Sequence, residues 1–100
     1  MHIELTANAR KRLVQLIEHH RSEGNLKKGK RTVEKILKQA RKLGKHPELG
    51  QVEEYLTQEK KGHRYLLVER LYKVIYLAHP KRIVITDVFD VRQDPSKIRG

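Results

Sequence analysis

Apolar residues in the first half of the chain recur at intervals of three and four residues, which is the period of an amphipathic helix. One such stretch spans residues 9–20, and a second spans residues 26–43. Thr6 is a suitable N-cap for the first helix, Gly24 would end it in a left-handed conformation, and Asn25 can cap the second. The pattern therefore predicts two antiparallel helices joined by a short turn.

Short runs rich in β-branched and aromatic residues predict strands on either side of the helices. Ile3 and Leu5 lie two positions apart near the start of the chain, as they would on one face of a short strand. Tight turns at residues 69–70 and 79–81 would link three further strands, at residues 64–68, 71–78 and 82–91. Consecutive strands with such short links predict an antiparallel meander.

The segment between the second helix and the meander has no clear period. Within residues 46–50, the proline disfavours helix before it and the final glycine closes a turn. Val52, Tyr55 and Leu56 could anchor one helical turn. Residues 60–62 are typical of a loop. The sequence therefore does not decide between helix and loop for residues 51–62.

These elements define the expected fold class. Their order is β-α-α-β-β-β, which predicts an α+β protein with a helical hairpin packed on one face of a small, mainly antiparallel sheet. One hundred residues leave room for one hydrophobic core, so we expect a single domain over residues 1–100.

The composition narrows the function. Cysteine is absent, which excludes disulfides, thiol chemistry and cysteine zinc sites, and no motif indicates a cofactor or a metal. Unbroken apolar stretches reach about five residues, too few to span a membrane. No secretion signal is visible, so we expect a cytoplasmic protein without a membrane partner.

The charge is strongly positive. The chain has 23 Lys and Arg against 12 Asp and Glu, a net charge of +11, which favours a polyanion or an acidic protein as partner. Many of the cations follow the second predicted helix: Lys27, Lys28, Lys30, Arg31, Lys35, Lys38, Arg41, Lys42 and Lys45. They could form a ridge that binds phosphate or acidic groups, or an ordinary solvated helix face.

Three local motifs resemble the RelE/ParE superfamily of bacterial toxin–antitoxin toxins. The sequence HPELG at 46–50 is similar to that family's turn after its second helix. RYLLVERLYKVIY at 64–76 resembles its strand–turn–strand core, with a Tyr-Lys-x-x-Tyr motif at 72–76. VFDVRQDPSKI at 88–98 resembles the closing strand and basic tail of ParE-like members. The resemblance covers nearly all of the chain and includes the order of its elements.

This resemblance implies a growth-inhibiting toxin that a cognate antitoxin protein holds silent. The family has two branches, and they differ in their target. ParE-like members inhibit DNA gyrase and have no hydrolytic site, whereas RelE-like members cut mRNA on the ribosome. A basic surface is compatible with both branches. A small structural RNA-binding protein is a third, more remote interpretation that rests on charge alone.

The RelE-like branch implies a set of catalytic residues in this chain. Alignment on the Tyr-Lys-x-x-Tyr motif brings Lys73, Arg92 and Arg64 near basic catalytic positions of that branch. The tyrosine that RelE-like enzymes carry near the C-terminus is missing here, since no Tyr or His follows Arg92. His63 could replace it as an acid–base group. The simpler interpretation is that His63 is exposed at the start of a strand.

The missing tyrosine and the VFDVRQDP motif favour the ParE-like branch, and thus a gyrase inhibitor without catalysis. Target or antitoxin binding would then fall on the tail, at Arg92, Asp94, Lys97 and Arg99. In that case the strand residues would be scaffold.

Several other polar residues have a structural interpretation. Asp87 interrupts the apolar alternation of the last strand, which could mark a bulge or a polar pocket. Tyr72 and Tyr76 share one strand face as packing residues, and Lys73 lies on the opposite face. His20 falls on the apolar stripe of the first helix, where we expect it to be packed.

Overall fold

The computed structural model describes residues 2–100 of the chain. Its elements follow one another along the chain as β1 (His2–Leu5), α1 (Ala7–Ser22), α2 (Leu26–Lys42), β2 (Gln51–Val52), the 3-10 helix η1 (Glu54–Glu59), β3 (Arg64–Val68), β4 (Tyr72–His79), β5 (Arg82–Asp90) and the 3-10 helix η2 (Pro95–Lys97).

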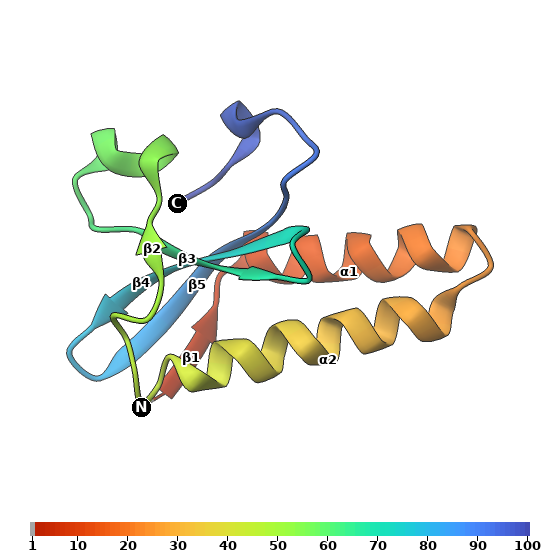
Figure 1. Ribbon diagram of the computed structural model, residues 1–100, viewed down its shortest axis with the longest axis horizontal. Coiled ribbons are helices and arrows are strands. Elements are labelled where there is room, and N and C mark those ends of the chain that lie inside the picture. Colours follow the sequence, from red (N-terminus) through yellow and green to blue (C-terminus); the bar gives the residue numbers. More distant parts are fainter. Residues whose placement is uncertain (1) are drawn as a thin grey trace.

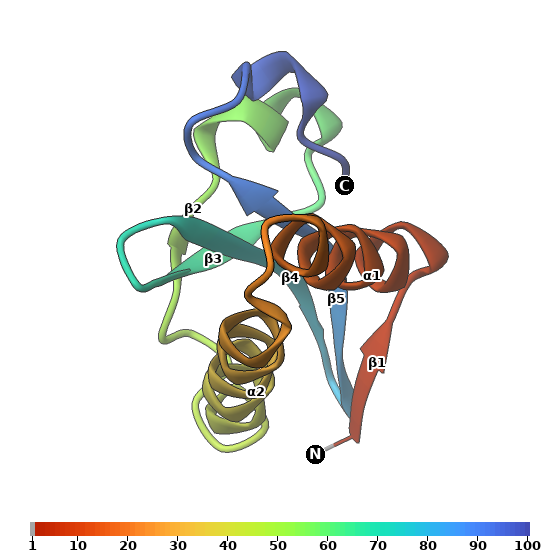
Figure 2. The ribbon, with the colours of Figure 1, turned by 90° about the vertical axis from the view of Figure 1, so that its right-hand side faces the viewer.

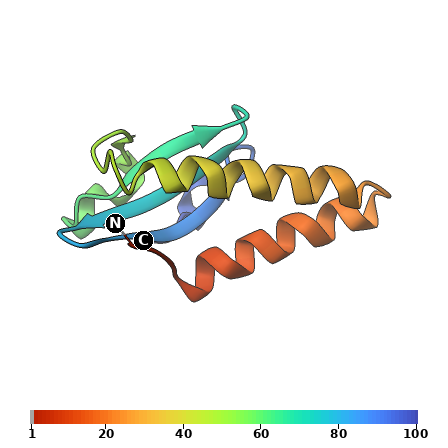
Figure 3. The same cartoon turned by 90° about the horizontal axis from the view of Figure 1, so that it is seen from below.

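The strands form one five-stranded sheet in the order β1-β5-β4-β3-β2. β1 runs parallel to β5, and the other neighbours are antiparallel. The two long helices lie antiparallel across one face of this sheet, as Figures 1 and 3 show. The α+β class and the helical hairpin are therefore confirmed. The short strand β2 is an addition to the predicted order.

The start of the chain is fixed against its last strand. Residues from His2 to Leu5 pair with residues from Arg82 to Ile85, about eighty positions further on. Thr6 follows directly, and its side chain accepts a hydrogen bond from the Ala9 amide at 3.1 Å. This bond is the predicted N-cap, and it starts α1 where β1 ends.

A close contact holds the helical hairpin together. A Cβ on Gly29 would lie 2.9 Å from the Cβ of His20, so only glycine lets the two helices approach this closely. His20 is half-buried, and its Nδ1 lies 2.9 Å from the Leu16 carbonyl. The predicted packing of His20 is confirmed. Gly24 has a φ of 72° in the connecting turn, as predicted, whereas the Asn25 side chain makes no capping bond.

The core has two parts, one on each face of the sheet. Between helices and sheet, the cluster includes Ile36, Leu43, Val74, Tyr76 and Ile83, all at most 1% exposed. On the far face, a smaller cluster consists of Leu56, Ile75, Phe89 and Ile98. Tyr72 and Tyr76 face the helices, and Lys73 points to the far face, which confirms the predicted division of β4.

The segment before β3, whose secondary structure the sequence did not decide, contains a helical turn, η1. Leu56 anchors it in the far-face cluster, whereas Val52 and Tyr55 are 54% and 62% exposed and anchor nothing. Figure 2 shows η1 beside the last residues of the chain, so these two segments together cover the far face of the sheet. No helix within residues 2–100 is long and apolar enough to cross a membrane.

Tyr76 clamps the turn after α2 to the sheet. Its hydroxyl donates to the Pro47 carbonyl at 2.7 Å and accepts from the Gly50 amide at 2.8 Å. A Cβ on Gly50 would lie 2.6 Å from that hydroxyl oxygen and 2.7 Å from the Tyr65 carbonyl oxygen. The glycine is therefore required by this close approach, and Tyr76 has the predicted packing role.

Candidate functional site: the C-terminal segment and the cavity beside α1

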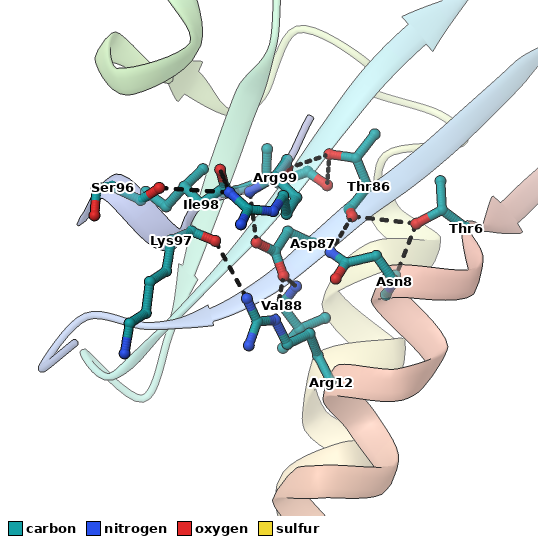
Figure 4. A network of polar contacts seen from close by, with 12 residues as sticks. Thr6, Asn8, Arg12, Thr86, Asp87, Val88, Ser96, Lys97, Ile98 and Arg99 are labelled. Carbon is teal, nitrogen blue, oxygen red and sulfur yellow. Dashed lines mark hydrogen bonds and ion pairs between the residues drawn. The ribbon is translucent and has the colours of Figure 1, made fainter. Parts of the chain in front are cut away.

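A bulge interrupts β5 at the point where the alternation of apolar and polar residues along the strand breaks. The register between β4 and β5 shifts there, and no β4 residue lies directly opposite Thr86 in the strand pairing. The Thr86 carbonyl instead accepts hydrogen bonds from the Thr6 hydroxyl at 3.1 Å and the Asn8 amide at 2.9 Å (Figure 4). The bulge predicted from Asp87 is confirmed, and it joins β5 to the start of α1.

Asp87 lies next to the bulge with its side chain fully buried. Its Oδ1 accepts from the Arg12 Nε at 3.0 Å and the Val88 amide at 2.9 Å, and its Oδ2 accepts from the Arg99 amide at 2.9 Å (Figure 4). Arg12 also donates to the Lys97 carbonyl at 3.2 Å. The buried carboxylate is therefore well supplied with donors, and it ties the end of the chain to α1 and β5.

The C-terminal segment, residues 91–100, is ordered by further contacts. Asp94 caps η2 by accepting from the Ser96 amide at 2.9 Å, and this bond lowers the pKa of Asp94. Ile98 is buried in the far-face cluster. The Thr86 hydroxyl donates to the Arg99 carbonyl at 3.3 Å. The segment therefore carries the predicted binding residues of the tail on one fixed stretch of backbone.

Arg92 stands at the start of this segment and is largely exposed. Its guanidinium donates to both carboxylate oxygens of Asp90, with the shortest distance 2.7 Å from Nη2 to Oδ2. This hydrogen bond lowers the pKa of Asp90 and raises that of Arg92. The ion pair holds Arg92 at the end of β5 with its outer side open to solvent.

A cavity of about 470 Å³ opens beside Arg92, between α1 and the ends of β4 and β5. Burial raises the pKa of the Tyr72 hydroxyl in its wall. Its lining combines arginines with apolar side chains, which suits an acidic or aromatic side chain of a protein partner. The lining residues are Arg12, Gln15, Leu16, His19, Tyr72, Val88, Phe89, Asp90, Arg92 and Gln93.

Arg64 and Lys73 lie on opposite faces of the sheet. Arg64 pairs with Tyr76, so its side chain is on the helix face, where its Nη1 donates to the Gly50 carbonyl at 2.8 Å. Lys73 pairs with Leu67 and points to the far face. Two of the predicted nuclease residues are thus separated by the sheet itself.

The ammonium of Lys73 is already engaged. Its Nζ lies 3.0 and 3.3 Å from the two carboxylate oxygens of Glu53, a residue only 1% exposed. The same nitrogen is 4.5 Å from the centre of the Tyr65 ring and 5.5 Å from that of Tyr55. Its charge is balanced inside the protein, between a carboxylate and two aromatic faces.

His63 is buried, so the interpretation as an exposed residue is wrong. It is 2% exposed, and neither ring nitrogen has a hydrogen-bond partner. Burial lowers the pKa of His63, opposed by Glu59, whose carboxylate lies 3.6 Å from Nδ1. The backbone of Gly100 covers the ring, because a Cβ there would lie 2.7 Å from Nε2. The C-terminal segment is the distant piece of chain that buries this histidine.

The three aspartates near the end of the chain serve three separate structural purposes. Asp87 forms an ion pair with Arg12, Asp90 forms one with Arg92, and Asp94 caps η2. Within the part of the chain that the structure describes, no group of three or more His, Cys, Asp and Glu side chains could hold a metal ion.

Two charged residues of these sites were not among the predicted ones. Arg12 and Glu53 pair with Asp87 and Lys73, which lie 75 and 20 positions away in the sequence. No local spacing signals such pairs. The indication in the sequence was Asp87, the one charged residue within positions 83–89 of β5.

The fold defines a class of small α+β proteins with a helical hairpin on a mainly antiparallel sheet. One similar solved structure is described as the chromosomal ParDE TA system from P. aeruginosa. The match has a TM-score of 0.74 at 22% sequence identity, and it covers 90% of this chain and 95% of that chain.

Residues 3–95 match the family described as the ParE toxin of type II toxin-antitoxin systems, parDE. The chain therefore belongs to the ParE toxin family, and the resemblance to the RelE/ParE superfamily is confirmed. No curated protein sequence is significantly similar to it.

Proposed function

We propose that the chain is a cytoplasmic, growth-inhibiting toxin that acts by binding DNA gyrase, and that a cognate antitoxin silences it. In this proposal the toxin catalyses no reaction itself. The observation that carries it is the separation of Arg64, Lys73, Arg92 and His63, the four groups that a ribosome-dependent mRNA endonuclease would need together.

Cleavage of RNA without a metal needs a base, an acid and cations around one phosphate. Arg64 is bonded on the helix face, and Lys73 is paired with Glu53 on the far face. His63 is buried without access to a substrate. Arg92 adjoins Asp90, which pairs with Tyr72, whereas Arg64 pairs with Tyr76 four positions along β4. That spacing corresponds to about 13 Å along a strand.

The binding surface is the C-terminal segment together with the cavity beside α1. The bonds to Asp87 fix this segment before any partner arrives, which reduces the ordering entropy that binding would cost. Arg92, Lys97 and Arg99 present positive charge along it, and Asp94 fixes its turn. An antitoxin with acidic and aromatic side chains would fit the same cavity and compete with the target.

A supercoiling assay with purified gyrase tests the proposal. We expect the double variant Arg92→Ala/Lys97→Ala to need at least about tenfold more protein for half-inhibition, because both side chains face solvent on the segment. The matched control Lys60→Ala/Lys61→Ala removes two exposed cations from the loop after η1 and should inhibit like the wild type. Equal inhibition by both variants would show that the C-terminal segment is not part of the surface that binds gyrase.

Pulse labelling after induced expression distinguishes the targets in cells. An early fall in thymidine incorporation with continuing translation supports the gyrase proposal. An immediate stop in amino-acid incorporation supports an mRNA endonuclease, and Lys73→Gln and Arg64→Gln should then abolish arrest. Arrest of neither process would point away from both targets and towards a structural RNA-binding protein.

A further inference from the structure

The outer face of α2 is a second charged surface, away from the C-terminal segment. Residues 26–42 include eight Lys and Arg side chains and one acidic residue, Glu34, and all nine are exposed. Within residues 2–100, Lys35 is the one α2 cation in an ion pair, with Glu69 at 3.2 Å. The other α2 cations therefore have no carboxylate within 4.0 Å to balance them.

The cations are arranged as a stripe along the helix. Lys27, Arg31, Lys38 and Lys42 follow spacings of four, seven and four residues, which place them on one side of an α-helix. That side is opposite the buried residues Thr32, Ile36 and Ala40. The stripe extends over about 22 Å at a rise of 1.5 Å per residue. Figures 1 and 2 show α2 at the margin of the molecule, with α1 and the sheet on its inner side.

A small hollow continues the stripe at the start of α2. It has a volume of about 210 Å³, and its lining includes Lys28, Arg31 and Lys35 together with Glu69. Lys35 is paired with Glu69, so Lys28 and Arg31, which have no ion pair within residues 2–100, are the two cations of this hollow that can receive a phosphate group.

The same face has none of the apolar groups that anchor protein partners. Among residues 2–100 the exposed large hydrophobic side chains are Val14, Leu49, Val52, Tyr55, Leu67 and Val91. None of these lies on α2. Protein interfaces are depleted in lysine and centred on buried aromatic or aliphatic anchors, so this face is unsuited to a protein. Phosphate backbones need cations alone.

The stripe also has no aromatic side chain on which an unpaired base could stack, which favours a duplex over a single strand. We propose that the outer face of α2, with the stripe Lys27, Arg31, Lys38 and Lys42, binds the phosphate backbone of double-stranded DNA without sequence preference. The choice of DNA over duplex RNA rests on the proposed function, in which the toxin meets an enzyme that holds DNA. Through this face the toxin would bind the DNA next to its target.

Fluorescence anisotropy with a labelled DNA duplex tests this binding in the absence of gyrase. The variant K27Q/R31Q/K38Q/K42Q removes four charges from the stripe, and glutamine keeps a high helix propensity. The matched control R10Q/K11Q/K60Q/K61Q removes four exposed cations from other elements and has the same net charge. Circular dichroism verifies that both variants fold.

We expect the wild type and the control to bind the duplex with a log affinity that falls steeply with log salt. In the stripe variant we expect affinity at least about tenfold weaker than in the control, and a salt slope smaller by about four units. Equal affinity of the two variants would overturn the proposal, as would absence of binding by the wild type at low salt.

Three competitors test whether duplex DNA is the preferred ligand of the α2 face. Tighter binding of a duplex RNA of the same sequence, of single-stranded DNA or of polyglutamate at equal charge concentration would overturn the assignment to duplex DNA. Gyrase inhibition is measured separately, so the two proposals fail separately. Inhibition without DNA binding overturns only this inference, and DNA binding without inhibition overturns only the gyrase target.

Discussion

Two buried ionisable side chains hold the C-terminal segment, and they differ in how their polar atoms are satisfied. Asp87 receives three hydrogen bonds, from Arg12, Val88 and Arg99. His63 is buried nearly as fully, yet neither of its ring nitrogens has a partner. The segment is therefore attached by directional bonds at Asp87 and by packing of Gly100 on a neutral ring at His63.

This contrast shows that burial alone does not indicate what a charged residue contributes. A buried carboxylate with a full set of donors fixes one arrangement of the chain, because any other arrangement leaves it unpaired. A buried neutral imidazole tolerates small movements of its neighbours, since it has no bonds to break. The first contact determines the position of the segment, and the second makes its end sensitive to pH.

The largest effect is expected from removing the Asp87 carboxylate. Asp87→Ala leaves the Arg12 guanidinium and the Arg99 amide without their acceptor, and we expect a loss of about 3–5 kcal/mol in the free energy of unfolding. Urea unfolding monitored by circular dichroism measures it. The control Asp94→Ala removes an acid from the exposed turn of the same segment and should change stability far less. A loss below about 1 kcal/mol for Asp87→Ala would contradict the anchoring role.

A smaller loss is expected at Glu53. Glu53→Ala leaves Lys73 and one backbone amide, that of Tyr55, without their acceptor, whereas Asp87→Ala frees a guanidinium and two backbone amides. We therefore expect a loss of about 2 kcal/mol, less than at Asp87, in the same unfolding experiment. A loss larger than that of Asp87→Ala would make the far-face pair, and not Asp87, the main polar anchor of the sheet.

The His63 contact predicts a pH dependence of stability. Burial lowers the pKa of His63 below its usual 6.5, so the unfolded chain takes up a proton at a higher pH than the folded chain does. The stabilisation by neutral His63 is present above pH 6.5 and is lost as the pH falls from there through the lowered pKa. The slope for one group is at most about 1.4 kcal/mol per pH unit.

Unfolding curves of the wild type and of His63→Phe at pH 7.5, 6.5 and 5.5 measure this effect. The phenyl ring keeps an aromatic body in the pocket and cannot titrate, so the difference between the two curves isolates His63 from the other histidines. We expect the wild type to lose stability relative to the variant on acidification. Parallel curves would show that His63 does not stay neutral in the fold.

The smallest effect is expected at the bulge. Thr86→Val keeps the shape of the side chain and removes the hydroxyl that lies 3.3 Å from the Arg99 carbonyl and 3.4 Å from the Ile75 carbonyl. The hydroxyl has one hydrogen to donate, so only one of these two carbonyls is bonded at a time, and at this long distance we expect a loss of about 1 kcal/mol in the free energy of unfolding. An unchanged midpoint would mean that Asp87 alone holds this part of the segment.

Much of the fold could be predicted from the sequence because its signals are local. The helical hairpin follows from apolar spacing and from Thr6 and Gly24, and the meander follows from the period-two runs. β2 could not be predicted, since its two residues, Gln51 and Val52, are both exposed and carry no alternation. Its pairing depends on where β3 lies in space.

The site was less predictable than the fold for a related reason. The charge in the last strand marks Asp87, but its partner Arg12 belongs to a helix face that otherwise looks solvated. His63 was misjudged because its cover comes from Gly100, 37 positions further on. Buried polar residues are identified by their partners, and these partners are brought together only by the tertiary fold.

The parallel pairing of β1 with β5 also affects how the molecule forms. Residues from His2 to Leu5 can pair only after residues 82–85 have been synthesised, so β1 stays unpaired until β5 has been made. Contacts of such high sequence separation form late and slow folding. We expect pulsed hydrogen exchange during refolding to protect the α1 and α2 amides before those of β1. A chain with this topology completes its sheet only after residues 82–85 have left the ribosome.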